Sequence, residues 1–269
     1  MDRPLPLPAQ RMPATPTPAQ IEAIERATLE ALRPAHLHAI AHWLLPFDHA
    51  EVGRARSAVP LRHDGLDLAA LPALCAHYQQ NGWPVVLRIA DVPGLRPWQA
   101  ALQAQGYQPS AAVHVQTATV HTLRQAAAHT SAPPTTRSAT PDTAWSSVYT
   151  AEGFDAVDGA QRAQLLSRSA GACYATVQSG GQSLAAGVGC IGQGWLSLHG
   201  MRTVPAAQGR GLAGALIGTL ADWAQAQGVG HAFLQVEADN APALALYRRF
   251  GFKTAWTYHY WKAPASAAA

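Results

Sequence analysis

The chain of 269 residues has few cysteines, little net charge and no long apolar run. Its three cysteines, Cys75, Cys173 and Cys190, lack metal-ligand spacing, and their odd number argues against a disulfide framework, so we expect a cytoplasmic protein without a metal site. The balance of 19 basic and 16 acidic residues gives a net charge of +3, which indicates no nucleic-acid or membrane surface. No apolar run approaches the roughly 18–20 residues of a membrane-spanning helix.

Apolar residues make up 48% of the chain, which is enough for a substantial core. Residues 1–18 are predicted to be a disordered, proline-rich tail without the apolar segment of a signal peptide. Residues 123–139, rich in Ala, Thr, Ser and Pro, are predicted to be a linker, and 264–269 a second tail. These boundaries leave a first half at 19–122 and a second half at 140–263.

Both halves show the pattern of an α/β protein (α+β), in which strands are flanked by helices. The first half is expected to open with a helix that Thr17 caps, with Pro18 in its first turn, and that Pro34 ends. We then expect strands at 42–47, 54–61, 84–89 and 111–120, and helices at 67–80 and just before Gly106. In the second half we expect helices at 142–152, 159–169, 211–227 and 241–250, and strands at 172–178, 183–191, 195–203, 231–237 and 256–261.

The two halves also resemble each other at one fixed offset. Val59-Pro60 and Val204-Pro205 each end a predicted strand before a helix (205 − 60 = 145), and Gly106-Tyr107 and Gly251-Phe252 each follow a helix (251 − 106 = 145). The recurrence of one offset at separate elements predicts two related domains.

A glycine-containing loop precedes the long helix of the second half. In the run Gln208 to Ala213, Gly209 and Gly211 remove side chains where a ligand would approach the backbone. The free N–H groups of the first helical turn form an anion site that suits a pyrophosphate. A tight strand-to-helix turn is the plain structural alternative. A Rossmann fingerprint would need a third glycine, and a Walker loop a Gly-Lys-Ser/Thr sequence, which is absent.

This loop resembles the cofactor loop of the GCN5-related N-acetyltransferase (GNAT) superfamily, through Gln208-x-x-Gly211-x-Ala213 after a strand that ends in Val-Pro. The resemblance implies a mixed, mostly antiparallel sheet flanked by helices, with acetyl-CoA as co-substrate. It implies that the loop amides hold the CoA pyrophosphate and that the end of the preceding strand pairs its backbone with the pantetheine arm. The residues so assigned are Met201, Arg202, Thr203, Gln208, Gly209, Arg210, Gly211, Leu212, Ala213 and Gly214. Arg210 and Arg202 are expected to add charge at the rim of the loop.

A second motif, from Asn240 through Ala243, Leu246 and Tyr247 to Gly251-Phe252, resembles the other GNAT signature. By resemblance, Asn240 contacts the cofactor arm and Tyr247 protonates the departing CoA thiolate. A phenol with a pKa near 10 is a credible donor to a thiolate of comparable basicity. Structural roles are the alternative: Asn240 as a helix cap, Gly251 as a helix stop and Tyr247 as a core aromatic residue.

The position from which a glutamate accepts the amine proton in the related ribosomal-protein N-acetyltransferases holds Gln235, which cannot act as a base. Glu237 lies two residues further along, on the same strand face, and is our candidate base, with a surface ion pair as the alternative. His199 is a second candidate, and an ordered water is a third.

The first half keeps the scaffold pattern but not the loop. At the repeat offset the loop residues become His63, Asp64, Leu66 and Leu68, and Tyr247 becomes Leu102. A carboxylate at Asp64 would repel pyrophosphate. The first half thus resembles the degenerate N-terminal halves of tandem GNAT proteins, and we expect it to support the second half and to wall part of the acceptor cleft.

The sequence therefore predicts an N-acetyltransferase that moves an acetyl group from acetyl-CoA directly to a primary amine of a small molecule or peptide. A non-catalytic acyl-CoA-binding sensor or partner module is the alternative, and a nucleotide-binding domain is a third possibility. His259 either lines the acceptor cleft or packs within an aromatic strand, and the sequence favours packing. It gives no oligomeric state.

Overall fold

The computed structural model describes residues 15–130, 132–169 and 171–264. The predicted tails at 1–18 and 264–269 lie largely outside the described residues. The first half contains α1 (Pro18–Leu32), β1 (His36–Ile40), β2 (Trp43–Phe47), β3 (Val59–Pro60), α2 (Leu71–Gln80), β4 (Val86–Ala90), α3 (Arg96–Ala104), β5 (Gln108–Pro109) and β6 (Val113–Thr119). It also contains a 3-10 turn at Gly53–Ala55 (η1).

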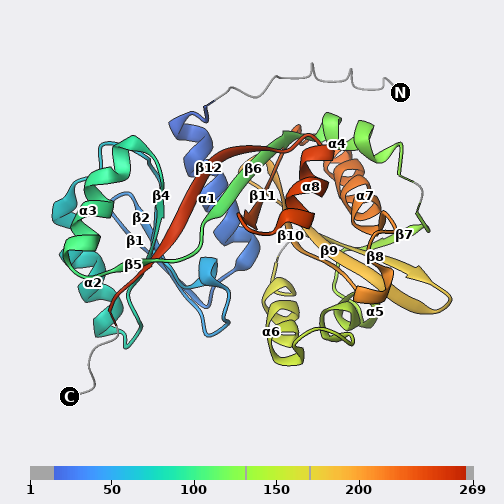
Figure 1. Cartoon of the computed structure of the whole chain (residues 1–269), viewed down its shortest axis with the longest axis horizontal. Coiled ribbons are helices and arrows are strands. Elements are labelled where there is room, and N and C mark those ends of the chain that lie inside the picture. Colours follow the sequence, from blue (N-terminus) through green and yellow to red (C-terminus); the bar gives the residue numbers. More distant parts are fainter. Residues whose placement is uncertain (1–14, 131, 170, 265–269) are drawn as a thin grey trace.

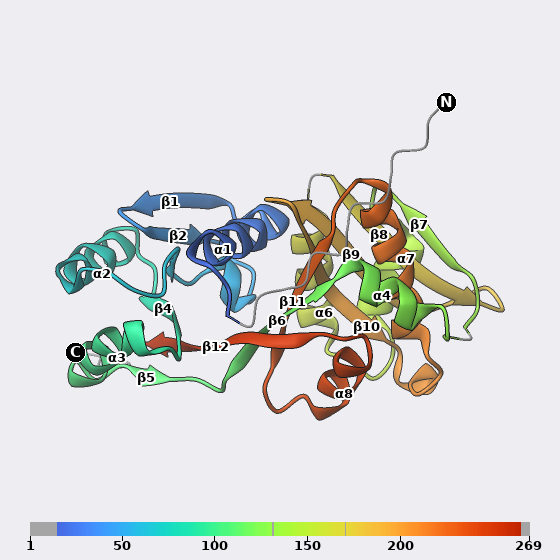
Figure 2. The ribbon, with the colours of Figure 1, turned by 90° about the horizontal axis from the view of Figure 1, so that it is seen from above.

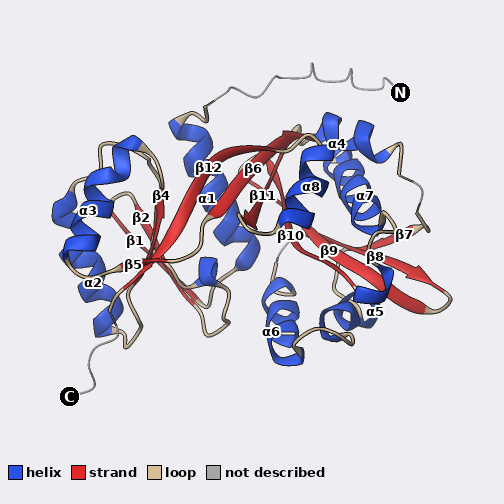
Figure 3. Ribbon diagram, in the orientation of Figure 1, coloured by secondary structure: helices blue, strands red, loops and turns tan. Residues whose placement is uncertain are grey.

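The remainder contains α4 (Val120–Ala127), β7 (Thr135–Ser138), α5 (Thr143–Ser147), α6 (Ala156–Leu166), β8 (Ala172–Ser179), β9 (Gln182–Gly192), β10 (Trp195–Thr203), α7 (Leu212–Ala226), β11 (His231–Glu237), α8 (Ala241–Arg249) and β12 (Lys253–Lys262). The strands form one nine-stranded sheet, in the order β4-β12-β6-β11-β10-β9-β8-β7 with β5 on β12, and a separate sheet β1-β2-β3 (Figure 3). The large sheet is mixed and mostly antiparallel, since β10 and β11 run parallel and its other named strand pairs are antiparallel.

Helix α1 begins and ends where the sequence predicts. The hydroxyl of Thr17 accepts from the Gln20 amide at 3.3 Å, and the Gln20 side chain accepts from the Thr17 amide at 2.9 Å, which completes a capping box. Pro18 occupies the first turn, and Arg33 ends the helix with a left-handed φ of 43° just before Pro34. The apolar face of α1 packs into the core, with Ile24 fully buried.

In the second half the long alternating strands confirm the prediction, and both faces of the sheet are covered. On β8, Cys173, Ala175 and Val177 face a cluster beneath α4, α7 and α8. Ala172 and Tyr174 face the opposite cluster, beneath α1, α5 and α6. This alternation is the two-residue period of a strand that is buried on both sides.

The structure differs from two expectations, for residues 54–61 and 123–139, and adds a strand that was not expected. The strand expected at 54–61 is η1 followed by the two-residue strand β3, and β1 was not predicted. The stretch 123–139 contains the end of α4 and all of β7. The hydroxyl of Thr119 caps α4, whose Val120 and Leu123 are buried. The threonines and serine of β7 pair with β8 through the backbone, which needs no apolar side chains.

The two halves exchange strands. Strand β6 of the first half lies between β11 and β12, whereas β12 of the second half crosses to pair with β4 (Figures 1 and 2). In the β6–β12 pair Val113 lies opposite Tyr258, and these positions differ by the repeat offset (258 − 113 = 145). The large sheet is therefore continuous through both halves.

The helix ends at the repeat positions share one geometry. The Tyr107 amide donates to the Leu102 carbonyl at 3.0 Å, and the Phe252 amide donates to the Tyr247 carbonyl at 3.0 Å. The glycine before each donor is left-handed, with φ of 82° at Gly106 and 80° at Gly251. The internal resemblance in sequence thus corresponds to the same local backbone structure.

Candidate active site

The parallel strands β10 and β11 separate at the centre of the large sheet. They pair only from Trp195 to Leu198 and from His231 to Leu234. Beyond these residues β10 stays with β9 after a bulge between His199 and Arg202, whereas β11 stays with β6 as far as Glu237. The divergence opens a cavity of about 500 Å³ between the two strand ends.

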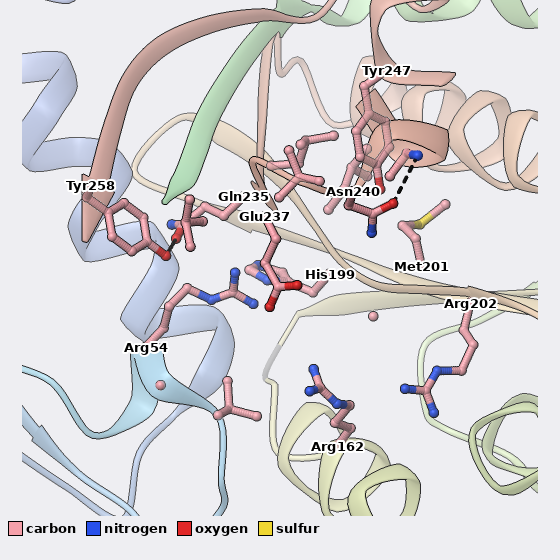
Figure 4. A pocket seen from close by; sticks show the side chains of 18 of the residues that line it. Arg54, Arg162, His199, Met201, Arg202, Gln235, Glu237, Asn240, Tyr247 and Tyr258 are labelled. Carbon is pink, nitrogen blue, oxygen red and sulfur yellow. Dashed lines mark hydrogen bonds between the residues drawn. The ribbon is translucent and has the colours of Figure 1, made fainter. Parts of the chain in front are cut away.

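Side chains from both halves line this cavity (Figure 4). The second half contributes the ends of β10 and β11 and one face of α8, and the first half contributes the segment that contains η1. The lining residues are Glu51, Val52, Gly53, Arg54, Val113, Arg162, Leu198, His199, Gly200, Met201, Arg202, Leu234, Gln235, Val236, Glu237, Asn240, Ala243, Tyr247, Tyr258 and Tyr260. The structure thus brings together the predicted site residues Met201, Arg202, Glu237, Asn240 and Tyr247, while Thr203 and the loop 208–214 lie beyond this wall.

The loop before α7 has the geometry of an anion site. Gly209 and Gly211 both have a left-handed φ of 76°, and a methyl group on Gly209 would meet no described atom within 4 Å. Within the described residues, the amides from Gly209 to Gly214 donate to no acceptor. These N–H groups lie at the positive end of α7, so the loop fits a pyrophosphate. A methyl group on Gly214 would contact Phe250 at 3.0 Å, so this glycine also lets α7 and α8 pack closely.

The side chain of Arg202 is bound on the α6 side of the cavity. Its Nη1 donates to the Tyr149 carbonyl at 2.9 Å, and its Nη2 lies 3.4 Å from Asp158 Oδ2. The guanidinium also stacks over the Phe154 ring at 4.4 Å. The exposed Arg210 is therefore the arginine that remains to add charge at the loop.

Helix α8 and its N-cap residue contribute the polar side chains of Asn240 and Tyr247 to the cavity. Asn240 caps the helix, because its Oδ1 accepts from the Ala243 amide at 3.1 Å. Tyr247 packs edge-on against Phe252, and burial raises the pKa of its hydroxyl to about 12. Within the described residues no side chain or backbone group hydrogen-bonds this hydroxyl. The phenol is thus protonated at neutral pH and available to a ligand.

Gln235 has a structural role at the position of the missing base. Its Oε1 accepts from the Tyr258 hydroxyl at 2.8 Å and from Arg88 Nη1 at 3.4 Å, and its Nε2 donates to Thr28 Oγ1 at 3.0 Å. Arg88 in turn forms a 2.8 Å ion pair with Glu25, and the two side chains are only 1% and 3% exposed. This network connects α1, β4, β11 and β12.

The two candidate bases differ in their environment. His199 is buried, and burial together with the positive charge of Arg54 lowers its pKa to about 3. Its imidazole is therefore neutral and too weakly basic to take a proton from an ammonium group. Glu237 is exposed at the end of β11, and its carboxylate faces the cavity (Figure 4). The geometry favours Glu237 over His199.

Several site residues escaped the sequence analysis. Arg54 and Tyr260 line the cavity although neither belongs to a motif of the second half. The sequence analysis also missed the buried ion pair of Arg88 and Glu25. Two signals were available: a charge within the apolar run Val85 to Ala90, and a charge on the apolar face of α1. An isolated charge in such a place needs a partner. His259 donates to or accepts from no cavity group; its Nδ1 lies 2.8 Å from the Ser110 carbonyl, as expected for packing.

In the first half, the space that corresponds to this cavity is filled by side chains. Trp256 and Tyr258 of β12 lie beside Val59, Pro60 and His63 there. The rings of His63 and Trp256 meet edge-on at 5.1 Å.

In the described parts of the chain no helix is long and apolar enough to cross a membrane, and no cluster of three His, Cys, Asp or Glu side chains could hold a metal ion.

Comparison with known proteins identifies the architecture. Residues 18–261 match the family described as probable histone acetyltransferase Rv0428c C-terminal. A GCN5-related N-acetyltransferase from Kribbella flavida has a similar structure, with a TM-score of 0.65 at 15% identity over 92% of this chain and 97% of that one. A tandem GNAT protein from the clavulanic acid biosynthesis pathway gives a TM-score of 0.62 at 18% identity over 94% and 91% of the two chains. At these identities the two structures show the fold alone.

Curated relatives match over shorter segments. The streptothricin acetyltransferase of Streptomyces lavendulae is 39% identical over 57 residues, which are 21% of this chain and 30% of that protein. The mycothiol acetyltransferase of Clavibacter michiganensis subsp. michiganensis (strain NCPPB 382) is 43% identical over 68 residues, which are 23% of this chain and 22% of that protein. The chain thus matches less than a third of the length of either relative.

Proposed function

Because this chain belongs to the Rv0428c C-terminal family of the GNAT acetyltransferase superfamily, we propose that it transfers an acetyl group from acetyl-CoA directly to a primary amine. The observation that carries this proposal is the split between β10 and β11, which has an anion-binding loop beyond it and Tyr247 inside it. The proposed acceptor is a small molecule or peptide, since the cavity of about 500 Å³ is lined by both halves.

The cofactor would lie along the split. The amides from Gly209 to Gly214 would bind its pyrophosphate, with Arg210 at the rim. The backbone from Met201 to Thr203 would pair with the pantetheine arm, because the bulge after His199 turns β10 away from β11. Asn240 would contact the same arm from the opposite side. The bound acetyl-CoA supplies the activated acetyl group.

The chain's own residues then handle two protons. Glu237 takes the proton of the acceptor ammonium, directly or through water, and so produces the free amine. The Tyr247 hydroxyl, which is protonated at neutral pH, gives its proton to the departing thiolate, and the proton that the nitrogen loses after its attack returns to the phenolate through water. Gln235 cannot exchange protons, and its hydrogen bonds fix β11 against the first half.

We also propose that the chain consists of two related GNAT-like units, the first at 19–122 and the second at 140–263. The common offset, the equivalent helix ends and the reciprocal exchange of β6 and β12 support this view. Only the second unit keeps the cofactor loop. The first unit has Asp64 and Leu66 there, and Trp256 packs against the neighbouring His63.

Turnover with a panel of amines tests the proposal. Release of free CoA that depends on both acetyl-CoA and an amine, with acetylated amine detected by mass, is the expected result. Melting temperature is measured in parallel with acetyl-CoA, ATP and NAD. Stabilisation by acetyl-CoA without acetylation of any amine would identify a sensor, whereas stabilisation by ATP or NAD alone would identify a nucleotide-binding domain.

A further inference from the structure

The first half places one arginine at the wall of the cavity through a short, well-defined turn. In η1 the Ala55 amide donates to the Val52 carbonyl at 2.8 Å, and the Ser57 hydroxyl donates to the Gly53 carbonyl at 2.8 Å. A methyl group on Gly53 would lie 2.8 Å from the Tyr260 ring, so the turn packs directly on β12. With Ala55 fully buried, this packing determines where Arg54 enters the cavity.

Arg54 differs from the other arginines around the site because it forms no ion pair with any described residue. Arg88 pairs with Glu25, and Arg162 and Arg202 both pair with Asp158. Within the described part of the chain Arg54 makes neither an ion pair nor a side-chain hydrogen bond, and its Nε is buried without a partner. An unpaired guanidinium in a partly closed site is costly, so its retention points to an anionic ligand group.

None of the described carboxylates near Arg54 forms an ion pair with it: Glu25, which acts on Arg54 electrostatically, is paired with Arg88, and Glu51 is exposed at the cavity. His199 and Gln235 are uncharged, and the pKa of the Tyr258 hydroxyl is raised well above its usual value, chiefly by burial. The carboxylate of Glu237 faces the same space as Arg54 but forms no ion pair with it (Figure 4). The cavity therefore presents a separate cation and anion, which is the complement of a molecule with an ammonium and an anionic group.

We infer that the acceptor is an amine that also carries a carboxylate, and that Arg54 binds this carboxylate while the amine lies toward Glu237. The inference rests on the proposed acetyl transfer and names its substrate class. A carboxylate matches the planar fork of a guanidinium. A phosphate dianion fits less well, because the carboxylates of Glu51 and Glu237, which line the same cavity, would repel its second charge.

The test compares matched acceptors on the full chain. Rates are measured with L-amino acids and small dipeptides, each as the free acid and as the carboxamide, and with ethanolamine and O-phosphoethanolamine. We expect kcat/KM to be roughly 10- to 100-fold higher for the acid, as for one charge-assisted hydrogen-bonded pair. The comparison is stringent, since an amino acid has less free amine at a given pH than its carboxamide.

Variants assign this preference to one side chain. Arg54→Gln should raise the KM for the acid and so abolish the preference over the carboxamide. Arg54→Lys should keep part of this preference. Arg56→Gln is the matched control, because Arg56 lines a neighbouring cavity and not this one. Acetyl-CoA binding should be unchanged in all three variants, and Arg54→Gln should unfold at a temperature no lower than that of the wild type, because it removes the unpaired charge.

Three outcomes would overturn the inference. They are equal rates for acids and carboxamides, a preference that survives in Arg54→Gln, and a stronger preference for O-phosphoethanolamine. The first two leave the proposed acetyl transfer intact, because amines are still acetylated. If acetyl-CoA raises the melting temperature but no amine is acetylated, the proposed function itself fails, and the inference fails with it.

Discussion

At the scale of single residues, burial decides which charges can take part in chemistry. Glu25 and Arg88 are almost completely buried and form an ion pair with each other, which connects α1 to β4 within the first half. His199 is buried without a partner for its Nε2 and stays neutral. Glu237 and Arg54 lie at the cavity with no ion-pair partner among the described residues, so they remain available to a substrate.

The buried ion pair gives the first prediction. Arg88→Met leaves the Glu25 carboxylate buried without a counter-ion and should lower the free energy of unfolding by about 3–5 kcal/mol. Arg124→Met removes an exposed ion pair with Asp222, at 2.5 Å, and should cost about 0–1 kcal/mol. Urea unfolding of the two variants measures both values. Equal losses would show that the buried pair contributes no more than a surface pair.

His199 gives a prediction about pH. Its pKa is about 3 in the folded protein and 6.5 in the unfolded chain. Between these values only the unfolded chain is protonated there, so the free energy of unfolding falls as the pH is lowered. From pH 7 to pH 5 the wild type should lose about 2 kcal/mol more than His199→Gln. His63, whose pKa burial lowers to about 4, contributes alike in both proteins. Parallel stability curves would contradict the assignment.

At the scale of elements, the sheet and helices of the second half follow from alternation and motif spacing. Strands β8 to β11 are long enough for the two-residue period to be read, and β11 spans the predicted residues His231–Glu237. Strand β1, with its largely exposed His36 to Ile40, has no buried face that a pattern would reveal. Strand β7 is Thr- and Ser-rich and takes its structure from β8. Long-range pairing, not local sequence, determines these strands.

The same limit applies to the site. The loop and the face of α8 were predicted, because each motif is contiguous along the chain. Arg54 was not, since it reaches the cavity only through the packing of η1 on Tyr260, 206 positions later (260 − 54 = 206). The network around Gln235 joins four elements in the same way.

The loop before α7 provides a prediction with an internal control. Gly211→Ala and Gly228→Ala place the same methyl group at left-handed positions, with φ of 76° and 77°, at opposite ends of α7. Each should cost about 1 kcal/mol of stability from backbone strain. Only Gly211→Ala should weaken acetyl-CoA binding, by about 10-fold or more, in calorimetric titration. If both variants bind acetyl-CoA as the wild type does, the loop is a structural turn.

At the scale of the whole molecule, the exchange of β6 and β12 makes the halves interdependent. Without the first half, β11 would become an edge strand paired only with β10, and β12 would lose its partners β4 and β6. Residues 140–269 expressed alone should therefore fail to unfold cooperatively. Co-expression with residues 1–139 should yield a complex that melts as one unit. A stable fragment 140–269 that binds acetyl-CoA would show that the halves fold separately.

The most direct test of the account is the rate of acetyl transfer by Tyr247→Phe. This change removes only the hydroxyl that faces the cavity and keeps the ring packed on Phe252. With the best amine from the panel, we predict that kcat falls about 100-fold while the Kd for acetyl-CoA is unchanged. A kcat equal to that of the wild type would contradict the assignment of this cavity as the site of transfer and of Tyr247 as its acid.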